Sequence, residues 1–374
     1  MSSFKLPPFH PPDFTLPPLN DSPVAQFKEV ELPGVAPEEY HATSIYPEYF
    51  QIRKREWVLA KNSRMDCVAV LEPGGSISVR EFRLLKPGDR VACGRRENGE
   101  DGIFVHVDAF EWERESLSSC RGFHEKFAFR TGVSRETSFS YDYDEIYNLL
   151  EHDRENGFLL WVLGPAVSFD KDSRESLAAI IDEGFVHGVL AGNALATHDI
   201  EAALFGTALG QDIYTKQHAQ LGHYKHLDAI NLIRKIGSIR KAVEMGLVNN
   251  GIIASLVRRG VPYVLAGSIR DDGPLPEVLT DSGEAQDKMR AMTGKATTII
   301  AMATQLHSIA AGNMTPSYRV MDDGTVRPVY FFIVDMSEFA ANKLADRGSL
   351  TARSILTNTQ DFVVNLHRKL VRKS

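Results

Sequence analysis

The spacing of hydrophobic and polar residues changes once along the chain, near Gly157. Within residues 25–135, short segments rich in β-branched and aromatic residues are separated by turn signals, which predicts a small β-rich domain, either a barrel or a sandwich. Five segments carry this prediction: REWVLA, MDCVAVLE, SISVREFRLL, DRVACGR and GIFVHVDAF. Residues 141–156 have the pattern of a helix that leads into the next domain.

After Gly157, apolar strand-like runs alternate with helical patterns. The strand-like runs are FLLWVLG, GVLAG, PYVLAG and VYFFIVD. The helical patterns are SRESLAAIIDEG, IEAALFGTAL, LDAINLIRKIGSIRKAVEMG, EAQDKMRAMTG and KATTIIAMATQLHSIAAG. This alternation predicts an α/β fold with a doubly wound parallel sheet, which binds ligands at the carboxyl ends of its strands. We therefore divide the chain into a proline-rich arm (1–24), a β-rich domain (25–150) and a Rossmann-like domain (151–374).

The arm holds seven prolines, which fix the backbone dihedral φ and favour an extended segment. It is either a loose tail or an arm strapped across a neighbouring subunit, because Phe4, Phe9, Phe14 and Leu19 favour burial. The second interpretation agrees with our expectation of a homo-oligomer.

Composition narrows the class of partner and the compartment. The 374 residues carry a net charge of −7, which argues against nucleic acid or an anionic membrane as the main partner. No apolar run approaches the ~20 residues that span a bilayer, and the N-terminus lacks the pattern of a secretory signal. The cysteines Cys67, Cys93 and Cys120 are odd in number and lack metal-ligand spacing, so we expect a reducing cytoplasmic setting and no metal site.

Small and polar residues follow the predicted strands. Gly192-Asn193-Ala194 lets a backbone approach a ligand, and Thr197 is a suitable N-cap for a helix with Asp199 in its first turn. Asp199 and Glu201 would oppose a phosphate docked on that helix end but would suit a cation such as a substrate ammonium. The alternative is a capped helix without further function.

Two further groups have the side chains that amino-acid chemistry needs. Arg270, Asp271 and Asp272 follow a strand, where carboxylates can orient amines or accept a proton and the arginine can bind a carboxylate; otherwise they form a polar turn. His223 and His226 can share a helical face with Lys225 beside them. We favour a surface, capping or acid/base role for these histidines over metal binding.

The chain contains no Gly-x-Gly and no Walker lysine motif, so a bound dinucleotide must use another loop layout. The strand VYFFIVD ends in Asp335, a position that presents a carboxylate to an adenosine ribose and favours NAD over NADP; otherwise Asp335 is a cap or turn residue. His307 and Asn313 flank a predicted helix end with Gly312 as its terminating residue, which would place Asn313 at the ligand edge.

Five long segments occur in the order of one known family: GNALATHDIE, GHYKHLDAINLIRKIGSI, VLAGSIRDDGPLP, HSIAAGNMTPS and VDMSEFAANKLADRGS. With them, the chain resembles the LOR/SDH bifunctional-enzyme conserved-domain family, which includes ornithine cyclodeaminases fused to arginine dihydrolases. The resemblance extends from about Tyr46 to the C-terminus. The chain differs from the family pattern after Gly164-Pro165-Ala166-Val167, where a His-Thr-Gly sequence is missing, and in an insertion at 317–328.

The resemblance implies a Rossmann-like domain similar to that of deoxyhypusine synthase, with tightly held NAD. The implied nucleotide-site residues are Asn193, Ala194, Gly267, Ser268, Asn313 and Asp335, with Arg347 and Gly348 closing the site.

The expected activity is NAD-dependent cyclodeamination of ornithine or a related diamino acid to a cyclic imino acid, proline, and ammonia. In this hypothesis Asp271 or Asp272 is the base and Lys225 or His226 a relay, while Asp199 binds the distal ammonium and Arg270 the carboxylate. The alternatives are an NAD-dependent dehydrogenase, another lyase or cyclase acting on a related amino acid, and a non-catalytic NAD-binding protein.

Overall fold

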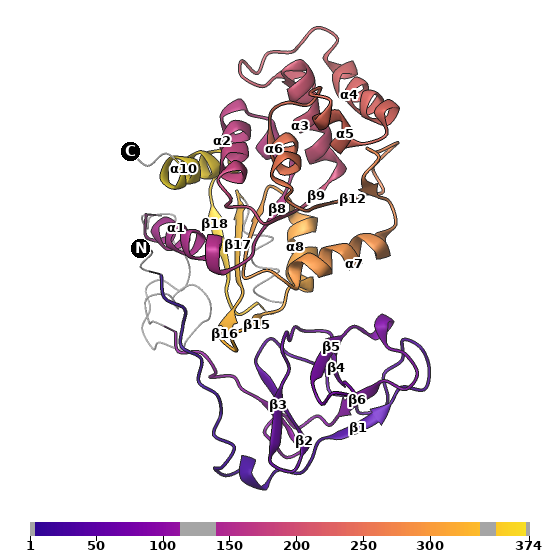
Figure 1. Cartoon of the computed structure of the whole chain (residues 1–374), viewed down its shortest axis with the longest axis vertical. Helices are drawn as coiled ribbons and strands as arrows, with labels where there is room; N and C mark the ends of the chain where they lie inside the picture. Colours follow the sequence, from indigo (N-terminus) through magenta and orange to yellow (C-terminus); the bar gives the residue numbers. More distant parts are fainter. Residues whose placement is uncertain (1–3, 113–139, 337–348, 372–374) are drawn as a thin grey trace.

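The computed structural model describes residues 4–112, 140–336 and 349–371, which form a small β-rich unit and a larger α/β unit (Figure 1). Arg347, Gly348 and Cys120 lie outside the described residues, so the roles expected for them are not addressed. Within the described part, no helix has the length and apolarity needed to cross a membrane.

The β-rich unit consists of two antiparallel sheets that share one core. One sheet has the order β1 (Gln26–Glu29), β6 (Arg90–Cys93), β4 (Val68–Leu71) and β5 (Ile77–Arg80), and the other has the order β3 (Glu56–Leu59), β2 (Glu48–Arg53) and β7 (Ile103–Val105). Phe50 and Ile103 from the second sheet pack with Ala69 and Ala92 from the first. The unit is therefore a small sandwich, one of the two expected forms.

A seven-stranded parallel sheet forms the centre of the larger unit. Its strands lie in the order β13 (Val278–Leu279), β12 (Tyr263–Ala266), β9 (Gly188–Gly192), β8 (Leu159–Leu163), β14 (Thr298–Met302), β17 (Tyr330–Asp335) and β18 (Ala352–Leu356). The direction of winding reverses between β8 and β14, which confirms the expected doubly wound sheet.

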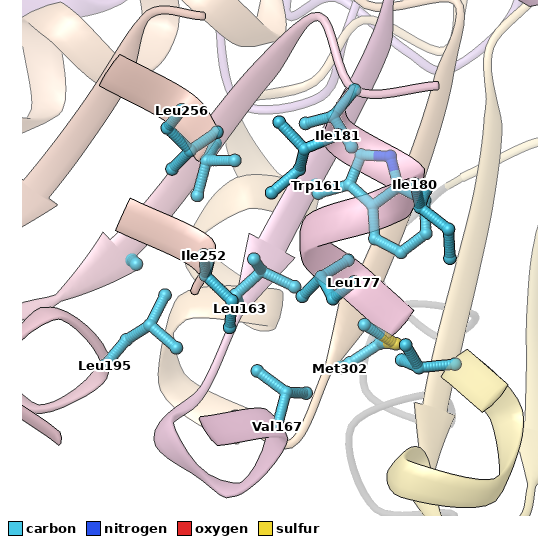
Figure 2. Packing of buried hydrophobic residues seen from close by; sticks show 14 of the residues in the cluster. Trp161, Leu163, Val167, Leu177, Ile180, Ile181, Leu195, Ile252, Leu256 and Met302 are labelled. Atoms are coloured by element: carbon cyan, nitrogen blue, oxygen red, sulfur yellow. The ribbon is translucent and has the colours of Figure 1, made fainter. Parts of the chain in front are cut away.

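Helices bury both faces of this sheet because alternate side chains of each strand point to opposite faces. Helices in the core of one face are α1 (Ser140–Asn156), α2 (Lys171–Asp182), α3 (Asn193–Phe205), α6 (Ile252–Arg259) and α10 (Thr359–Leu370). The other face is covered by α7 (Ser282–Thr293) and α8 (Gln305–Met314). Figure 2 shows Trp161 of β8 beside Leu177 and Ile180 of α2 in the first core. Helix α1 contributes Ile146 to this core, so the whole helix packs on the large sheet. The domain boundary expected at residue 150 would instead divide this helix between the two units.

The prediction of one helical pattern over KATTIIAMATQLHSIAAG is wrong in its first half. Thr298–Met302 form the strand β14 between β8 and β17, and helix α8 begins only at Gln305. All five residues of β14 are buried, because helices cover both faces. A strand of this kind has no polar alternation, and only its β-branched residues distinguish it from a buried helix.

The connection from β9 to β12 carries an additional group of elements. It contains α3, the β10–β11 hairpin (Thr207–Ala208 and Gln211–Asp212), α4 (Gly222–Ile236), α5 (Ile239–Glu244) and α6. The predicted helix over LDAINLIRKIGSIRKAVEMG is thus two helices, separated at Gly237, which adopts a left-handed φ of 86°. Figure 1 places α3, α4 and α5 at the end of the molecule farthest from the β-rich unit.

The insertion at 317–328 forms a hairpin, β15 (Tyr318–Val320) and β16 (Val326–Pro328), that joins the two units. The Ser317 hydroxyl donates to the Ser63 carbonyl of the β-rich unit at 3.1 Å. On the other side, Arg327 forms a buried two-point ion pair with Asp153 at 2.8 and 2.9 Å. Because β17 starts next to this hairpin, the carboxyl ends of the strands point away from the β-rich unit.

The proline-rich arm packs along its own chain. Phe4 contacts Tyr330, Phe9 contacts Phe110, and Phe14 stacks on Trp57 with ring centroids 4.8 Å apart. The short helix η1 (Leu19–Asp21) follows, with Leu19 buried. The interpretation of the arm as a loose tail is therefore wrong for its described part, and the arm across a neighbouring subunit stays a prediction.

Candidate functional site

The loop after β9 is shorter than the sequence suggested. Helix α3 begins at Asn193 with Gly192 as its N-cap, so Thr197 is an interior residue and not the cap. The first turn consequently has no acidic residue, and the positive end of the helix dipole meets no opposing carboxylate. The N-terminus of α3 can therefore bind a phosphate, because no acidic side chain in its first turn repels the anion.

Asp199 has a structural role in this fold. Its side chain is fully buried, with Oδ1 2.6 Å from Arg174 Nε. The carboxylate also accepts the backbone N–H groups of Ile252 at 3.1 Å and Ile253 at 2.7 Å, which caps the start of α6. The expectation that Asp199 binds the distal ammonium of a substrate is therefore corrected, because both oxygens are already engaged inside the protein.

The loop after β12 brings one carboxylate toward the sheet edge and leaves its neighbour outside. Asp271 is partly buried, and its Oδ2 accepts the backbone N–H of Ser268 at 2.8 Å. Asp272 and Arg270 are exposed. Gly267 lies where an added Cβ would approach the Leu279 carbonyl to 2.8 Å. The two candidate bases thus occupy different environments, and Asp271 is the one that faces other site residues.

His307, in the first turn of α8, contacts this group from the far side of β8. An added Cβ at Gly192 would lie 3.1 Å from the His307 Cε1. Burial lowers the pKa of His307 below its ordinary value, although the nearby Asp271 carboxylate raises it in part. His307 is therefore neutral near pH 7 and can accept a proton. The sequence indicated His307 only as a residue flanking a helix end.

Asn193 connects the two strand-end loops. Its Oδ1 accepts the backbone N–H of Leu275 at 3.1 Å and the Thr197 hydroxyl at 3.3 Å. Ala194 follows in the exposed first turn of α3. The structure thus gathers most of the expected strand-end residues at one edge of the sheet, and we call the following residues the strand-end group: Gly192, Asn193, Ser268, Asp271 and His307.

The expected cofactor residues Asn313 and Asp335 lie apart from the loops that follow β9 and β12. Asn313 is in the last turn of α8, where its carbonyl accepts a hydrogen bond from Arg64 of the β-rich unit at 2.7 Å. This position is at the opposite edge of the sheet, and Gly312 lies within the helix instead of ending it. Asp335 ends β17 on the carboxyl edge, separated from β8 by β14.

A second polar pair lies further along α3. Glu201 is fully buried and accepts hydrogen bonds from His198 Nδ1 at 2.9 Å, from the Thr207 hydroxyl at 2.9 Å and from two backbone N–H groups, those of Leu209 and Gly210. Burial raises the pKa of Glu201, but the bonds from His198, Gly210 and Thr207 outweigh burial, and the pKa lies below its ordinary value. Glu201 is therefore ionised. The sequence interpretation named Glu201 only as a carboxylate suited to a cation and missed its pairing with His198, whose only signal was the His-x-x-Glu spacing in HDIE.

Helix α4 presents one of the three expected residues toward this pair. The ring of His226 lies 6.3 Å from that of His198, and the Lys225 Nζ lies 4.8 Å from the centroid of the Phe205 ring on α3. His223 is exposed and contacts only the neighbouring Tyr224 ring among the contacts of the described residues. His226 thus lies by the second polar pair, whereas Lys225 packs over Phe205 at the end of α3 and His223 against Tyr224.

Residues 4–112, 140–336 and 349–371 contain no group of three or more His, Cys, Asp or Glu side chains placed to hold a metal ion. Burial raises the pKa of Cys67 to about 11, so this thiol stays protonated.

The family model for "Arginine dihydrolase ArgZ-like, C-terminal, Rossmann fold" matches residues 145–366. The chain belongs to this family. The expected resemblance is thereby confirmed, together with the Rossmann-like unit. The match begins within α1, in agreement with the packing of this helix on the large sheet.

Members of the family and their structures resemble the chain over most of its length. An ornithine cyclodeaminase from Methanopyrus kandleri is 39% identical over 349 residues, covering 91% of this chain and 76% of the relative. The crystal structure of a LOR/SDH protein from Methanococcus maripaludis superposes with a TM-score of 0.82 at 35% identity, covering 94% and 99% of the two chains. A ternary complex of AgrE with ornithine and NAD+ matches with a TM-score of 0.57 at 32% identity, covering 96% of this chain and 47% of AgrE.

Proposed function

We propose that this protein is an NAD-dependent ornithine cyclodeaminase. It converts ornithine, or a related diamino acid, into a cyclic imino acid and ammonia, and the product from ornithine is proline. The observation that carries the proposal is the strand-end group at the carboxyl edge of the sheet, in a chain whose family neighbour AgrE binds ornithine and NAD+ together. The cofactor and the substrate class follow from this match.

The residues at the carboxyl edge fit NAD. Backbone N–H groups in the first turn of α3, including Asn193 and Ala194, suit the pyrophosphate because that turn has no acidic side chain. Gly267 and Ser268 line the next strand end, and the Asp335 carboxylate suits a ribose hydroxyl. When bound, NAD supplies a hydride acceptor for the carbon that carries an amine and returns the hydride to the cyclic imine.

The chain itself must bind the amino acid and move protons. The amine on the carbon to be oxidised must be neutral, and the neutral His307 imidazole beside Asp271 can accept the proton of its ammonium form. Arg270, exposed at the mouth of the site, suits the substrate carboxylate. His307 thus takes the role of base first expected for Asp271 or Asp272. Asp271 lies beside it and raises its pKa in part, whereas Asp272 faces solvent.

The proposal is tested by incubating purified protein with ornithine and a catalytic amount of NAD. We expect equal amounts of ammonia and proline without net accumulation of reduced nicotinamide. An Asp271→Asn variant should lose most of this activity, whereas the matched control Asp272→Asn should retain it. Accumulation of reduced nicotinamide in step with ornithine consumption would identify a dehydrogenase instead, and NAD binding without turnover of any basic amino acid would identify a non-catalytic protein.

We further propose that the protein is a homo-oligomer in the cytoplasm. Three large apolar side chains on the carboxyl-edge loops are exposed, Ile269 at 106%, Leu306 at 81% and Met336 at 75%, and a second copy of the chain would cover them. Cys67 and Cys93 are free thiols, as expected in a reducing compartment. Light scattering of the purified protein should give a mass of two or more chains, and a monomer at micromolar concentration would contradict the oligomer.

A further inference from the structure

We propose that His198, oriented by Glu201, is a second catalytic base of the site. It takes a proton from the distal ammonium of the diamino-acid substrate and later delivers it to the departing ammonia. This inference rests on the proposed cyclodeaminase function and adds a residue pair that acts at the other end of the substrate from His307.

The hydrogen bonds around Glu201 fix the state of the His198 ring. An ionised carboxylate only accepts hydrogen bonds, so the 2.9 Å contact with Glu201 places a proton on His198 Nδ1. Nε2 is then the ring nitrogen that faces away from Glu201 and can exchange a proton with a ligand. Within the described residues, no group hydrogen-bonds this Nε2, so it remains available to a ligand. A buried carboxylate that orients a histidine in this way is the arrangement used for general bases.

The position of His198 suits the second amine of the substrate. It lies five residues beyond Asn193 on the same helix, about 7.5 Å along the axis at ~1.5 Å per residue. The same five-residue step turns the helix by about 140°, so His198 faces the segment after β8 and α4, and a diamino acid held at the strand-end group would reach it with its distal amine. Phe169, in the segment after β8, packs edge-on against the His198 ring with centroids 5.4 Å apart, and His226 approaches from α4.

The proton transfers balance as follows. A distal N–H bond breaks and a His198 Nε2–H bond forms, which leaves the distal amine neutral. Its lone pair then forms the ring C–N bond with the electrophilic iminium carbon. The imidazolium returns its proton to the other nitrogen on that carbon, whose C–N bond breaks with the electron pair, releasing ammonia. The ring nitrogen still carries one extra proton, which passes to water as the ring C=N bond forms. The ammonia and this proton together make up the ammonium ion that the reaction releases.

The first test needs no turnover. Imidazole nitrogen NMR of the full-length protein should show His198 protonated on Nδ1 and not on Nε2, with the signal assigned by its loss in His198→Gln. Glu201→Gln should weaken this preference, and Glu201→Asp should restore part of it. A ring protonated on Nε2 in the wild-type protein would overturn the proposal, because it would have no free acceptor toward the substrate.

The second test separates steps of the reaction. His198→Gln should lower kcat for ornithine by about 100-fold, the usual contribution of a general base, while NAD affinity and KM change less than threefold. Substrate oxidation should still occur in a single turnover, and the near-ultraviolet absorbance of reduced nicotinamide should persist because ring closure is slow. The matched control is His223→Gln on α4, which should behave as wild type because the His223 side chain is exposed and lies against the Tyr224 ring.

The outcomes separate this inference from the proposed function. A wild-type protein that releases no ammonia from ornithine overturns the proposed function and this inference with it. An active wild-type protein with an equally active His198→Gln variant overturns this inference alone. A loss of NAD affinity in His198→Gln that matches its loss of kcat would also overturn it, because the residue would then act in cofactor binding.

Discussion

The Asp199 carboxylate and the Arg174 guanidinium meet inside the α/β unit, with Oδ1 and Nε 2.6 Å apart. The same carboxylate caps α6 through Ile252 and Ile253, and Arg174 also bonds the Asn250 side chain at 2.6 Å. One buried ion pair thus links α2, α3 and α6 on one face of the sheet. This relationship explains why an acidic residue occupies the second turn of the helix that starts the cofactor site.

Removal of this pair should reduce stability and not substrate affinity. Asp199→Ala leaves Arg174 buried without a counter-charge, so we expect the free energy of unfolding to fall by about 3–5 kcal/mol. Denaturant unfolding measures this change, with Asp272→Ala, an exposed carboxylate of the site loop, as the control. A stable Asp199→Ala variant with a strongly raised KM for ornithine would contradict the structural role.

The hairpin insertion should depend on its own buried ion pair. Arg327→Ala removes the ion-pair partner of Asp153. Burial raises the pKa of Asp153, but Arg327 and the hydroxyl of Thr297 lower it by more, so the carboxyl has a pKa below its ordinary value. We expect a loss of about 3–5 kcal/mol, because a buried carboxylate is left without its cation. The double variant Asp153→Leu with Arg327→Met should recover part of this loss in the same unfolding assay. A single Arg327→Ala variant as stable as wild type would show that the pair does not anchor the hairpin.

Gly192 should be required for the arrangement of the strand-end group. Its replacement by alanine puts a Cβ 3.1 Å from the His307 ring, which must then shift. We expect NAD affinity to fall by about tenfold, ~1.4 kcal/mol, measured by calorimetry. Gly74→Ala is the matched control, since nothing lies within 4 Å of the added Cβ there. Equal NAD affinity in both variants would remove Gly192 from the site.

The burial of His307 should appear in the pH dependence of stability. The unfolded chain binds the proton with the ordinary pKa of 6.5, whereas burial lowers the pKa in the folded state. His307 therefore has no effect above pH 6.5, and the fold loses stability as the pH falls from 6.5 toward the lowered pKa. Burial also lowers the pKa of His187, so the test compares wild type with His307→Gln. The difference in unfolding free energy should grow only below this pH, and a difference independent of pH would contradict the buried, neutral state.

Much of the fold followed from periodicity. Strands such as β8 and β17 are uninterrupted apolar runs that end at a glycine or an aspartate, and the sheet order follows from their alternation with helices. β14 was missed because its five residues are buried from both sides, so its apolar pattern continues into α8 without a break. Local pattern alone cannot separate the two when tertiary packing covers every face.

The sequence predicted the site residues that directly follow strands. It did not predict the residues whose role depends on a side-chain partner in another element. Gly192, Asn193 and Asp271 were found because loops follow strands. The burial of Asp199 was not predictable, since its partner Arg174 is 25 residues away in sequence and meets it only through the packing of α2 on α3. His198 and its pairing with Glu201 were missed for the converse reason. Their helical spacing is ordinary, and only the N–H groups of the β10–β11 hairpin show that Glu201 is a buried anion.

The fate of the hydrogen on the substrate Cα tests the central claim most directly. Ornithine deuterated at Cα is converted by the enzyme with a catalytic amount of unlabelled NAD, and the proline formed is analysed by mass spectrometry and NMR. We expect proline to keep the deuterium at its own Cα, because the hydride leaves and returns to the same carbon within one site. Proline without deuterium at Cα, or deuterium recovered in free reduced nicotinamide, would contradict it.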